Sequence, residues 1–166
     1  MNSRKKVILY CFSAMSAFFF LYPLFSHAFS VGVTIRGKVL SPPCTINGGR
    51  DIFVNFGSGI LPGSINGINH EKPLPYTVDC PAGTSNLLKL QVAGTGAAFN
   101  ASLLSTNKNN LAIEIKSNGT RLAINNWIDF VYPTQPALSA VLVRISTGSI
   151  SLGTINATAT IIVEYR

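Results

Sequence analysis

Cysteine is the residue type in this chain with the most definite chemistry. Beyond the apolar N-terminal stretch, the sequence contains two cysteines, Cys44 and Cys80. In an oxidising compartment they are expected to form one disulfide, which would close a loop of about 37 residues and stabilise the fold by roughly 4 kcal/mol. A metal site is the poorer interpretation, because zinc needs three or four ligands and this region adds a single histidine, His70.

Acid–base and nucleophilic chemistry has few candidates. His70 lies in the polar stretch NINHEKP, where a solvated loop residue is expected rather than a general base. The six acidic residues are isolated along the chain, and there is no GxSxG motif, phosphate-binding glycine-rich loop or metal-ligand spacing. Trp127 is expected in the core or partly buried, rather than as a sugar-stacking platform. The sequence therefore predicts a protein that is not an enzyme and that uses no cofactor or metal.

The N-terminus predicts export. Arg4-Lys5-Lys6 precede a long apolar run, and Ser26-His27-Ala28 follow it, which is the pattern of a secretory signal peptide cleaved after Ala28. The competing interpretation is an uncleaved membrane anchor over residues 7–25. Removal of residues 1–28 leaves ten basic and six acidic residues, with no basic cluster of the kind that binds nucleic acid. We therefore expect no membrane span after cleavage and no nucleic-acid partner.

The elements that must position these residues are strands. Short runs rich in Val, Ile and Leu alternate with clusters of Gly, Pro, Asn and Ser, and helical periodicity is nearly absent. Turn-forming pairs such as Asn118-Gly119 separate the runs. Pro42-Pro43 should interrupt the first strand before Cys44, and residues 95–110 are expected to form a long polar loop. The runs expected to be strands, which together suggest a β-sandwich, are 31–40, 52–56, 74–79, 87–92, 111–115, 138–145 and 154–165.

The two ends of the exported chain show the clearest alternation. Near its start, one face of an extended strand would carry Phe29, Val31, Val33 and Ile35. At the C-terminus a second apolar face consists of Ala157, Ala159, Ile161, Val163 and Tyr165. Two interpretations remain open at this point. Both strands lie inside a complete sandwich, or the sandwich lacks a strand, so that another protein covers the last strand while the N-terminal segment fills a neighbour's groove.

A family resemblance rests on three stretches of the chain. Residues 33–57, VTIRGKVLSPPCTINGGRDIFVNFG, resemble the opening of minor pilins of the chaperone-usher pathway and look closest to the PapF-like tip adaptor subunits. Cys80, in YTVDCP, falls where such subunits carry the partner of the first cysteine. Gly153 and the penultimate Tyr165 resemble the β-zipper ending of pilins. The resemblance is strong over residues 33–57 and the C-terminal residues, and weak over about 93–148.

The resemblance implies an all-β fold, an incomplete immunoglobulin-like β-sandwich that lacks its last strand and is completed by donor-strand complementation. Its expected parts are a signal peptide (1–28), a donor-strand extension (29–36) and the pilin domain (37–166). The donor residues would be Phe29, Val31, Val33 and Ile35. Gly153 and the apolar C-terminal face would line the groove beside the strand of a periplasmic pilus chaperone, and the carboxylate of Arg166 would be anchored in that chaperone. One departure is Gly32, which lies opposite the donor residues, whereas many pilins carry a glycine on the inserted face.

The implied function is that of a structural minor pilus subunit, a tip adaptor that links the adhesin to the fibre. An outer-membrane usher would exchange the chaperone's strand for the extension of the next subunit. The chain would pass through the periplasm to the fimbrium on the surface of a Gram-negative bacterium. The alternatives are a major or terminator pilin and, from a different class, a self-contained secreted carbohydrate-binding β-sandwich.

Overall fold

The computed structural model describes residues 31–37, 42–146 and 148–166. The expected signal peptide and the donor residue Phe29 therefore lie outside the described residues. The chain divides into two units, Met1–Val39 and Leu40–Arg166, and the described strands all belong to the second. Among the described residues, no helix is long and apolar enough to cross a membrane.

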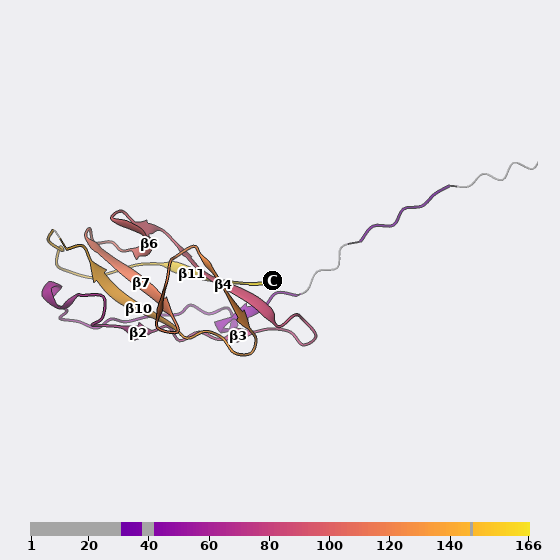
Figure 1. Cartoon of the computed structure of the whole chain (residues 1–166), viewed down its shortest axis with the longest axis horizontal. Coiled ribbons are helices and arrows are strands. Elements are labelled where there is room, and N and C mark those ends of the chain that lie inside the picture. Colours follow the sequence, from indigo (N-terminus) through magenta and orange to yellow (C-terminus); the bar gives the residue numbers. More distant parts are fainter. Residues whose placement is uncertain (1–30, 38–41, 147) are drawn as a thin grey trace, which may run out of the picture. The chain divides into compact units, whose positions relative to one another are not determined.

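The second unit is built from strands and two short 3-10 turns, and its described residues form no α-helix (Figure 1). The turns are η1, Asn47–Gly49, and η2, Pro62–Ser64. The strands are β1 (Thr45–Ile46), β2 (Lys72–Pro73), β3 (Val78–Asp79), β4 (Leu87–Gly94), β5 (Gly96–Ala97), β6 (Asn100–Ser105), β7 (Leu111–Ser117), β8 (Thr120–Leu122), β9 (Trp127–Val131), β10 (Leu138–Arg144) and β11 (Ala159–Tyr165). The all-β prediction is confirmed.

The strands form three antiparallel sheets. The largest has the order β2-β10-β7-β6-β5, with β8 paired to β7. A three-stranded sheet has the order β11-β4-β9, and β1 pairs with β3. The turn between β7 and β8 contains Asn118 and Gly119 at φ angles of 49° and 78°, a left-handed backbone that these two residue types adopt at low cost. The turn expected at this pair is therefore confirmed.

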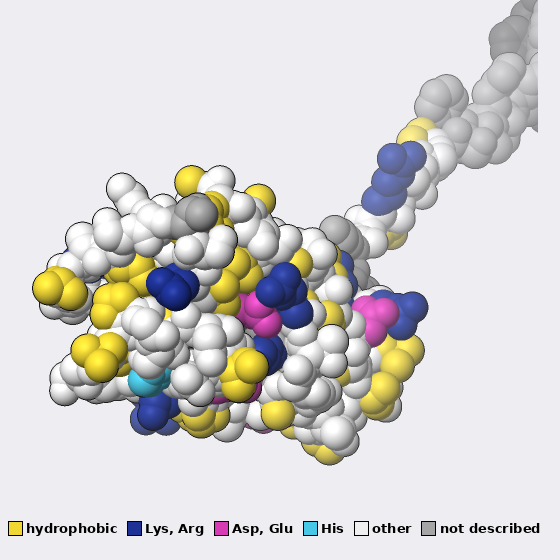
Figure 2. Space-filling view, turned by 60° about the vertical axis from the view of Figure 1, so that its left-hand side comes forward, with side chains coloured by type: hydrophobic (Ala, Val, Ile, Leu, Met, Phe, Trp, Pro, Cys, Tyr) yellow, Lys and Arg dark blue, Asp and Glu magenta, His cyan; other side chains and the backbone are white. Residues whose placement is uncertain are grey.

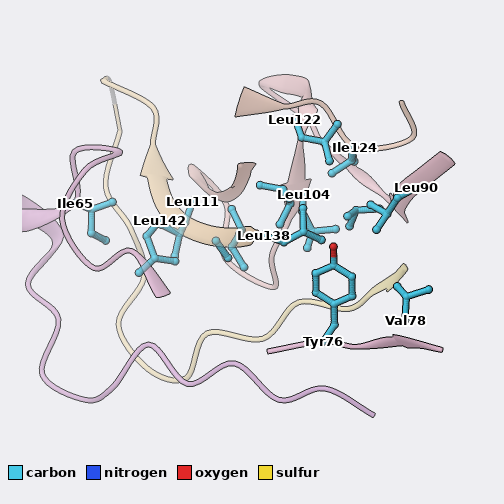
Figure 3. Close-up of a cluster of buried hydrophobic side chains, with 14 of the residues drawn as sticks. Ile65, Tyr76, Val78, Leu90, Leu104, Leu111, Leu122, Ile124, Leu138 and Leu142 are labelled. Atoms are coloured by element: carbon cyan, nitrogen blue, oxygen red, sulfur yellow. The ribbon is translucent and has the colours of Figure 1, made fainter. Parts of the chain in front are cut away.

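One buried cluster joins the two larger sheets (Figure 3). From the three-stranded sheet, β4 contributes Leu88, Leu90 and Val92, which are 0%, 0% and 1% exposed. Alternate residues of β7 and β10 in the largest sheet complete the centre of the cluster: Leu111, Ile113, Ile115, Leu138, Ala140 and Leu142. Because every second side chain of a strand points to the same face, the two sheets pack face to face as a sandwich.

Several expected strands are confirmed. The runs 87–92, 111–115 and 138–145 correspond to β4, β7 and β10, and the end of the run 154–165 is β11. In the run 74–79 only the last two residues are a strand, β3. These confirmed runs share a continuous apolar or alternating pattern and a neighbouring strand with which to pair.

Other expectations are wrong. Residues 95–110 are not a loop, because they contain β5 and β6, and β8 and β9 were not expected at all. Residues 52–56 alternate between half-buried and exposed but form no strand, and residues 31–37 of the run 31–40 form none either. Residues 38–40 of that run lie outside the described residues. A strand requires a hydrogen-bonded backbone partner as well as alternation, and that partner is not visible in the local sequence.

Candidate functional site

The last strand, β11, lies at the edge of its sheet. It pairs with β4 from Ala159 opposite Gly94 to Tyr165 opposite Leu88. The sheet order β11-β4-β9 leaves its other edge without a strand partner in the parts of the chain that the structure describes. Half of the backbone N–H and C=O groups of an edge strand point away from its neighbour and can pair with another strand.

The inward face of β11 is only partly covered. Ile161, Val163 and Tyr165 pack against the buried cluster, yet each of them is only half-buried, and Ala159 is exposed. The facing residues Leu88 and Leu90 on β4 are 0% exposed. An apolar face in contact with the core but open to solvent is what a sandwich shows where a neighbouring strand is missing.

A second unpaired segment, residues 50–61, lies on the other side of this opening. Ile52 and Phe56 pack against the buried cluster, whereas Phe53 between them is 86% exposed. The segment therefore alternates like a strand, although none of its described residues belongs to one. The expectation of a strand at 52–56 is wrong because the segment alternates but has no hydrogen-bonded backbone partner among the described residues. We call residues 50–61 and β11 together the open side of the sandwich.

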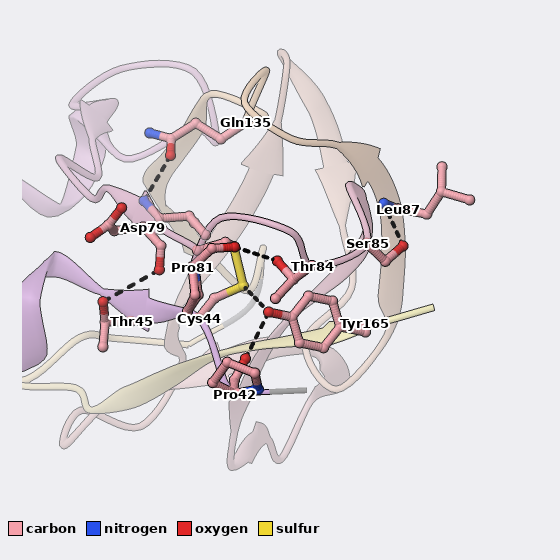
Figure 4. Close-up of a disulfide and its surroundings, with 12 residues drawn as sticks. Pro42, Cys44, Thr45, Asp79, Pro81, Thr84, Ser85, Leu87, Gln135 and Tyr165 are labelled. Carbon is pink, nitrogen blue, oxygen red and sulfur yellow. Dashed lines mark hydrogen bonds between the residues drawn. A yellow bond between two sulfur atoms is a disulfide. The ribbon is translucent and has the colours of Figure 1, made fainter. Parts of the chain in front are cut away.

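One end of the open side is tied by Tyr165 (Figure 4). Its hydroxyl donates a hydrogen bond to the carbonyl of Pro42 at 2.8 Å. The same oxygen lies 3.5 Å from the sulfur of Cys44. Cys44 forms the expected disulfide with Cys80, which confirms that prediction. The C-terminal end of β11 is thereby held beside the residues that precede segment 50–61.

At the other end of the open side, apolar residues of both walls line one small cavity. A cavity of about 50 Å³ lies there, lined on one side by Ile60 and Pro62 and on the other by Ile150 and Ile155. Because residues near position 44 meet residue 165, and residues near position 60 meet residues near 155, the two walls run in opposite directions. No backbone hydrogen bond joins them within the described ranges. The open side is therefore bounded at both ends and unpaired along its length.

The remaining expected site residues take definite places. Gly153 has a φ of 110° and lies where an added Cβ would be 3.3 Å from the ammonium of Lys108. The backbone N–H of Arg166 donates to the carbonyl of Leu87 at 3.0 Å, and its guanidinium lies 2.9 Å from the carboxylate of Asp129. Ala157 precedes β11 and is exposed. The expected donor residues Val31, Val33 and Ile35 are 71%, 79% and 91% exposed.

Titratable groups do not converge on a catalytic site in the described part of the chain. No group of three or more His, Cys, Asp or Glu residues there could hold a metal ion. Four of the six acidic side chains instead face cations, in the pairs Lys89–Glu164, Lys116–Glu71, Arg121–Glu114 and Arg166–Asp129. His70 is hydrogen-bonded to the hydroxyl of Ser64 at 2.8 Å. On the face shown in Figure 2, basic side chains are separated by apolar and uncharged ones, so no phosphate-binding patch is visible there.

Trp127 is more exposed than expected, at 39%. It lies on the outer face of β9, because its neighbours Ile128 and Phe130 pack against the core. The ammonium of Lys89 sits over its ring, 4.3 Å from the ring centroid, in a cation–π contact. The ring face under Lys89 is therefore already occupied.

Sequence reasoning missed several residues that shape the open side. Pro42 receives the Tyr165 hydrogen bond, and Asn107 and Lys108 hydrogen-bond the segment before β11. These contacts join positions far apart in the chain, so no local signal marks them.

Comparison with known proteins agrees with this architecture. Residues 33–166 match the family described as "Fimbrial protein". The fimbrial-like protein YfcQ of Escherichia coli K12 is 33% identical over 150 residues, which cover 85% of this chain and 91% of YfcQ. The fimbrial adapter PapF of Escherichia coli is 31% identical over 99 residues, 58% of this chain and 59% of PapF.

Solved structures show the same fold. The P pilus adaptor subunit PapF superimposes with a TM-score of 0.55 at 26% identity, and the match covers 78% of this chain and 100% of the PapF structure. The P pilus rod subunit PapA superimposes with a TM-score of 0.63 at 18% identity, covering 75% of this chain and 100% of PapA. The chain therefore belongs to the fimbrial protein family, as a PapF-like structural pilus subunit with the immunoglobulin-like pilin fold.

Proposed function

We propose that this chain is a minor subunit of a chaperone-usher pilus, a tip adaptor that joins the adhesin to the fibre by donor-strand exchange. The observation that carries the proposal is the open side, where β11 has a free edge and a half-covered apolar face. The similarity to the fimbrial adapter PapF supports the adaptor position rather than that of a major or terminator pilin. Export would proceed through the periplasm of a Gram-negative bacterium to the fimbrium on its surface.

In this proposal the open side is an acceptor groove. An inserted strand would pair with the free edge of β11 and cover Ile161, Val163 and the ring of Tyr165. Burial of four alternate apolar side chains would contribute on the order of 8 kcal/mol before the cost of ordering the strand. A periplasmic chaperone would supply this strand first, and an outer-membrane usher would direct its replacement by the next subunit's strand.

The C-terminus suits recognition by a chaperone that binds its carboxylate. The ladder bond from Arg166 to Leu87 continues the β11–β4 pairing to the last residue, so the carboxylate has a defined direction. The pair with Asp129 compensates the charge of the Arg166 guanidinium. A cationic cleft in the chaperone would then meet a carboxylate without an uncompensated neighbouring cation.

The donor half of the proposal is the extension 29–36. Val31, Val33 and Ile35 are exposed, although apolar side chains of this size gain free energy from burial. Inserted into the groove of a neighbouring subunit, they would be covered together with Phe29. Gly32 and Thr34 would then lie on the outward face of the inserted strand.

The rival interpretation, a carbohydrate-binding sandwich, has little support from the side chains that would have to bind sugar. The cavity of about 490 Å³ beside β5 and β6 includes Lys108 and Asn110. The ammonium of Lys108 is bonded to the carbonyl of Leu152, and the amide nitrogen of Asn110 to that of Ser149. Each of these side chains thereby uses one of its donors to bind the chain itself, which favours a structural role for this region.

Val33→Asp tests the donor half. The change would place a charge in an apolar groove at a cost of several kcal/mol, so we expect loss of incorporation into purified pili. The periplasmic level of the subunit should stay normal, since Val33 belongs to the extension rather than to the subunit's own core.

Thr34→Asp is the matched control on the opposite face, and its effect should be much milder. If Thr34→Asp blocks incorporation and Val33→Asp does not, the inserted face is the one that carries Gly32. If Val33→Asp abolishes the periplasmic subunit itself, the extension belongs to the subunit's own core, and the donor half of the proposal is wrong.

A further inference from the structure

The segment that leads from β10 to β11 borders the open side without being a strand. Its residues 149–156, here called the linker, contain no strand, and Ile150 and Ile155 pack partly buried against the core. The same two side chains line the cavity at the end of the open side. Leu152 between them is 84% exposed. The linker is therefore an apolar segment beside an uncovered apolar surface.

Three residues of one loop hold this linker from outside. Asn107 makes the most contacts with it. Its side-chain amide donates to the carbonyl of Thr154 at 3.1 Å, its side-chain oxygen accepts the N–H of Asn156 at 2.9 Å, and its own N–H donates to the carbonyl of Asn156 at 3.0 Å. This arrangement reproduces the bonds that a neighbouring strand would make.

The next bonds extend the same contact along the linker. The ammonium of Lys108 donates to the carbonyl of Leu152 at 2.8 Å, and the side-chain amide of Asn110 donates to the carbonyl of Ser149 at 3.0 Å. Gly153 follows Leu152 and has a φ of 110°, a backbone that other residues rarely adopt, and a Cβ there would lie 3.3 Å from the Lys108 ammonium. We call Asn107, Lys108 and Asn110 the clamp.

The clamp opposes a rearrangement in which the linker would move inward and cover the open side. Apolar surface left in water favours any rearrangement that covers it, and the linker carries Ile150, Leu152 and Ile155 beside the opening. Backbone carbonyls already bonded to the clamp cannot follow these side chains inward without breaking their hydrogen bonds. An unmade hydrogen bond of a buried carbonyl is costly, so the clamp favours the linker position in which the open side is vacant.

We propose that Asn107, Lys108 and Asn110 are positioning residues that keep the linker off the open side, so that the strand-free subunit stays receptive to an incoming strand. The inference rests on the proposed acceptor groove. It also gives Gly153 a role, because Gly153 directly follows Leu152, whose carbonyl accepts the Lys108 hydrogen bond.

The test compares Asn107→Ala with Gln135→Ala in the mature chain. Gln135 makes the same pair of side-chain hydrogen bonds to a different segment. Its amide donates to the carbonyl of Tyr76 and its side-chain oxygen accepts the N–H of Val78, both at 2.9 Å. The probes are two synthetic peptides, one with the sequence of residues 29–37 and one of equal length that alternates valine and threonine. Affinity is measured by titration calorimetry, and stability by urea denaturation.

We expect the two variants to lose similar stability, but only Asn107→Ala to bind the peptides at least about tenfold more weakly, because its two side-chain hydrogen bonds to the linker are lost. Lys108→Met keeps the apolar part of the side chain and should weaken binding severalfold. It replaces Asn107→Ala in the test if that variant does not fold. If the folded clamp variants bind like the wild type, or if Gln135→Ala weakens binding equally, the clamp proposal is wrong and the acceptor groove is unaffected. A wild-type protein that binds neither peptide overturns the acceptor groove and the clamp with it.

Discussion

Replacement of Tyr165 tests how firmly the last strand is tied to the start of the domain. Tyr165→Phe removes the hydrogen bond to Pro42, whose net contribution is about 1 kcal/mol. Tyr165→Ala also removes the half-buried ring. If about 100 Å² of the ring is covered, about half of what an aromatic side chain can bury, its loss costs about 2.5 kcal/mol more. We therefore expect the free energy of unfolding to fall by about 1 kcal/mol in the first variant and about 3.5 kcal/mol in the second.

The assay is urea denaturation of the mature chain followed by fluorescence. Trp127 is the single tryptophan, and it lies on β9 in the same sheet as β11, so its signal reports the unfolding of that sheet. With a slope of about 1.5 kcal/mol per molar urea, the midpoint should shift by about 0.7 M for Tyr165→Phe and about 2.3 M for Tyr165→Ala. Thr160→Ala is the control, since Thr160 is exposed on the same strand. It should change stability by less than about 0.5 kcal/mol.

Two outcomes would refute this reasoning. A Tyr165→Phe variant as stable as the wild type would mean that the Pro42 bond is replaced by water at no cost. A loss below about 1 kcal/mol for Tyr165→Ala would mean that the ring does not contribute its apolar contact with the core. The first result would leave the ring contact and the pairing with β4 to hold the C-terminal end of β11, whereas the second would leave only that pairing.

Two more predictions concern the disulfide and a buried tyrosine. Replacing both Cys44 and Cys80 with serine should lower stability by about 4 kcal/mol in the chain-entropy account, and an unchanged urea midpoint, or free thiols in denatured, unreduced wild-type protein, would contradict this. Burial raises the pKa of Tyr76 to about 12, so the folded protein retains a proton that the unfolded chain loses near pH 10, and stability should decline as pH rises from 10 to about 12. Tyr76→Phe should show a smaller decline over that range in urea midpoints, and an equal decline in both proteins would count against the assignment.

Local pattern was sufficient for the strands at the centre of the sandwich. The runs at 87–92, 111–115 and 138–145 are strongly apolar because their core-facing side chains are buried. The same burial is why the pattern predicted these strands correctly. The prediction of a loop at 95–110 was wrong because β6 lies there. Within β6 only Leu103 and Leu104 are apolar residues buried in the core. Two leucines among Asn, Ser and Thr are a weak signal compared with the turn-forming composition around them.

What the sequence by itself determined is the all-β class, the Cys44–Cys80 pair and the alternation of the last strand, because these follow from composition and from residues adjacent in the chain. Only the tertiary structure decided which alternating segments are paired. Residues 52–56 and 159–165 show the same pattern, yet the second pairs with β4 and the first with nothing described. Pairing depends on backbone groups supplied by residues distant in sequence. For the same reason Asn107 was indistinguishable from its polar neighbours until folding placed residues 149–156 beside it.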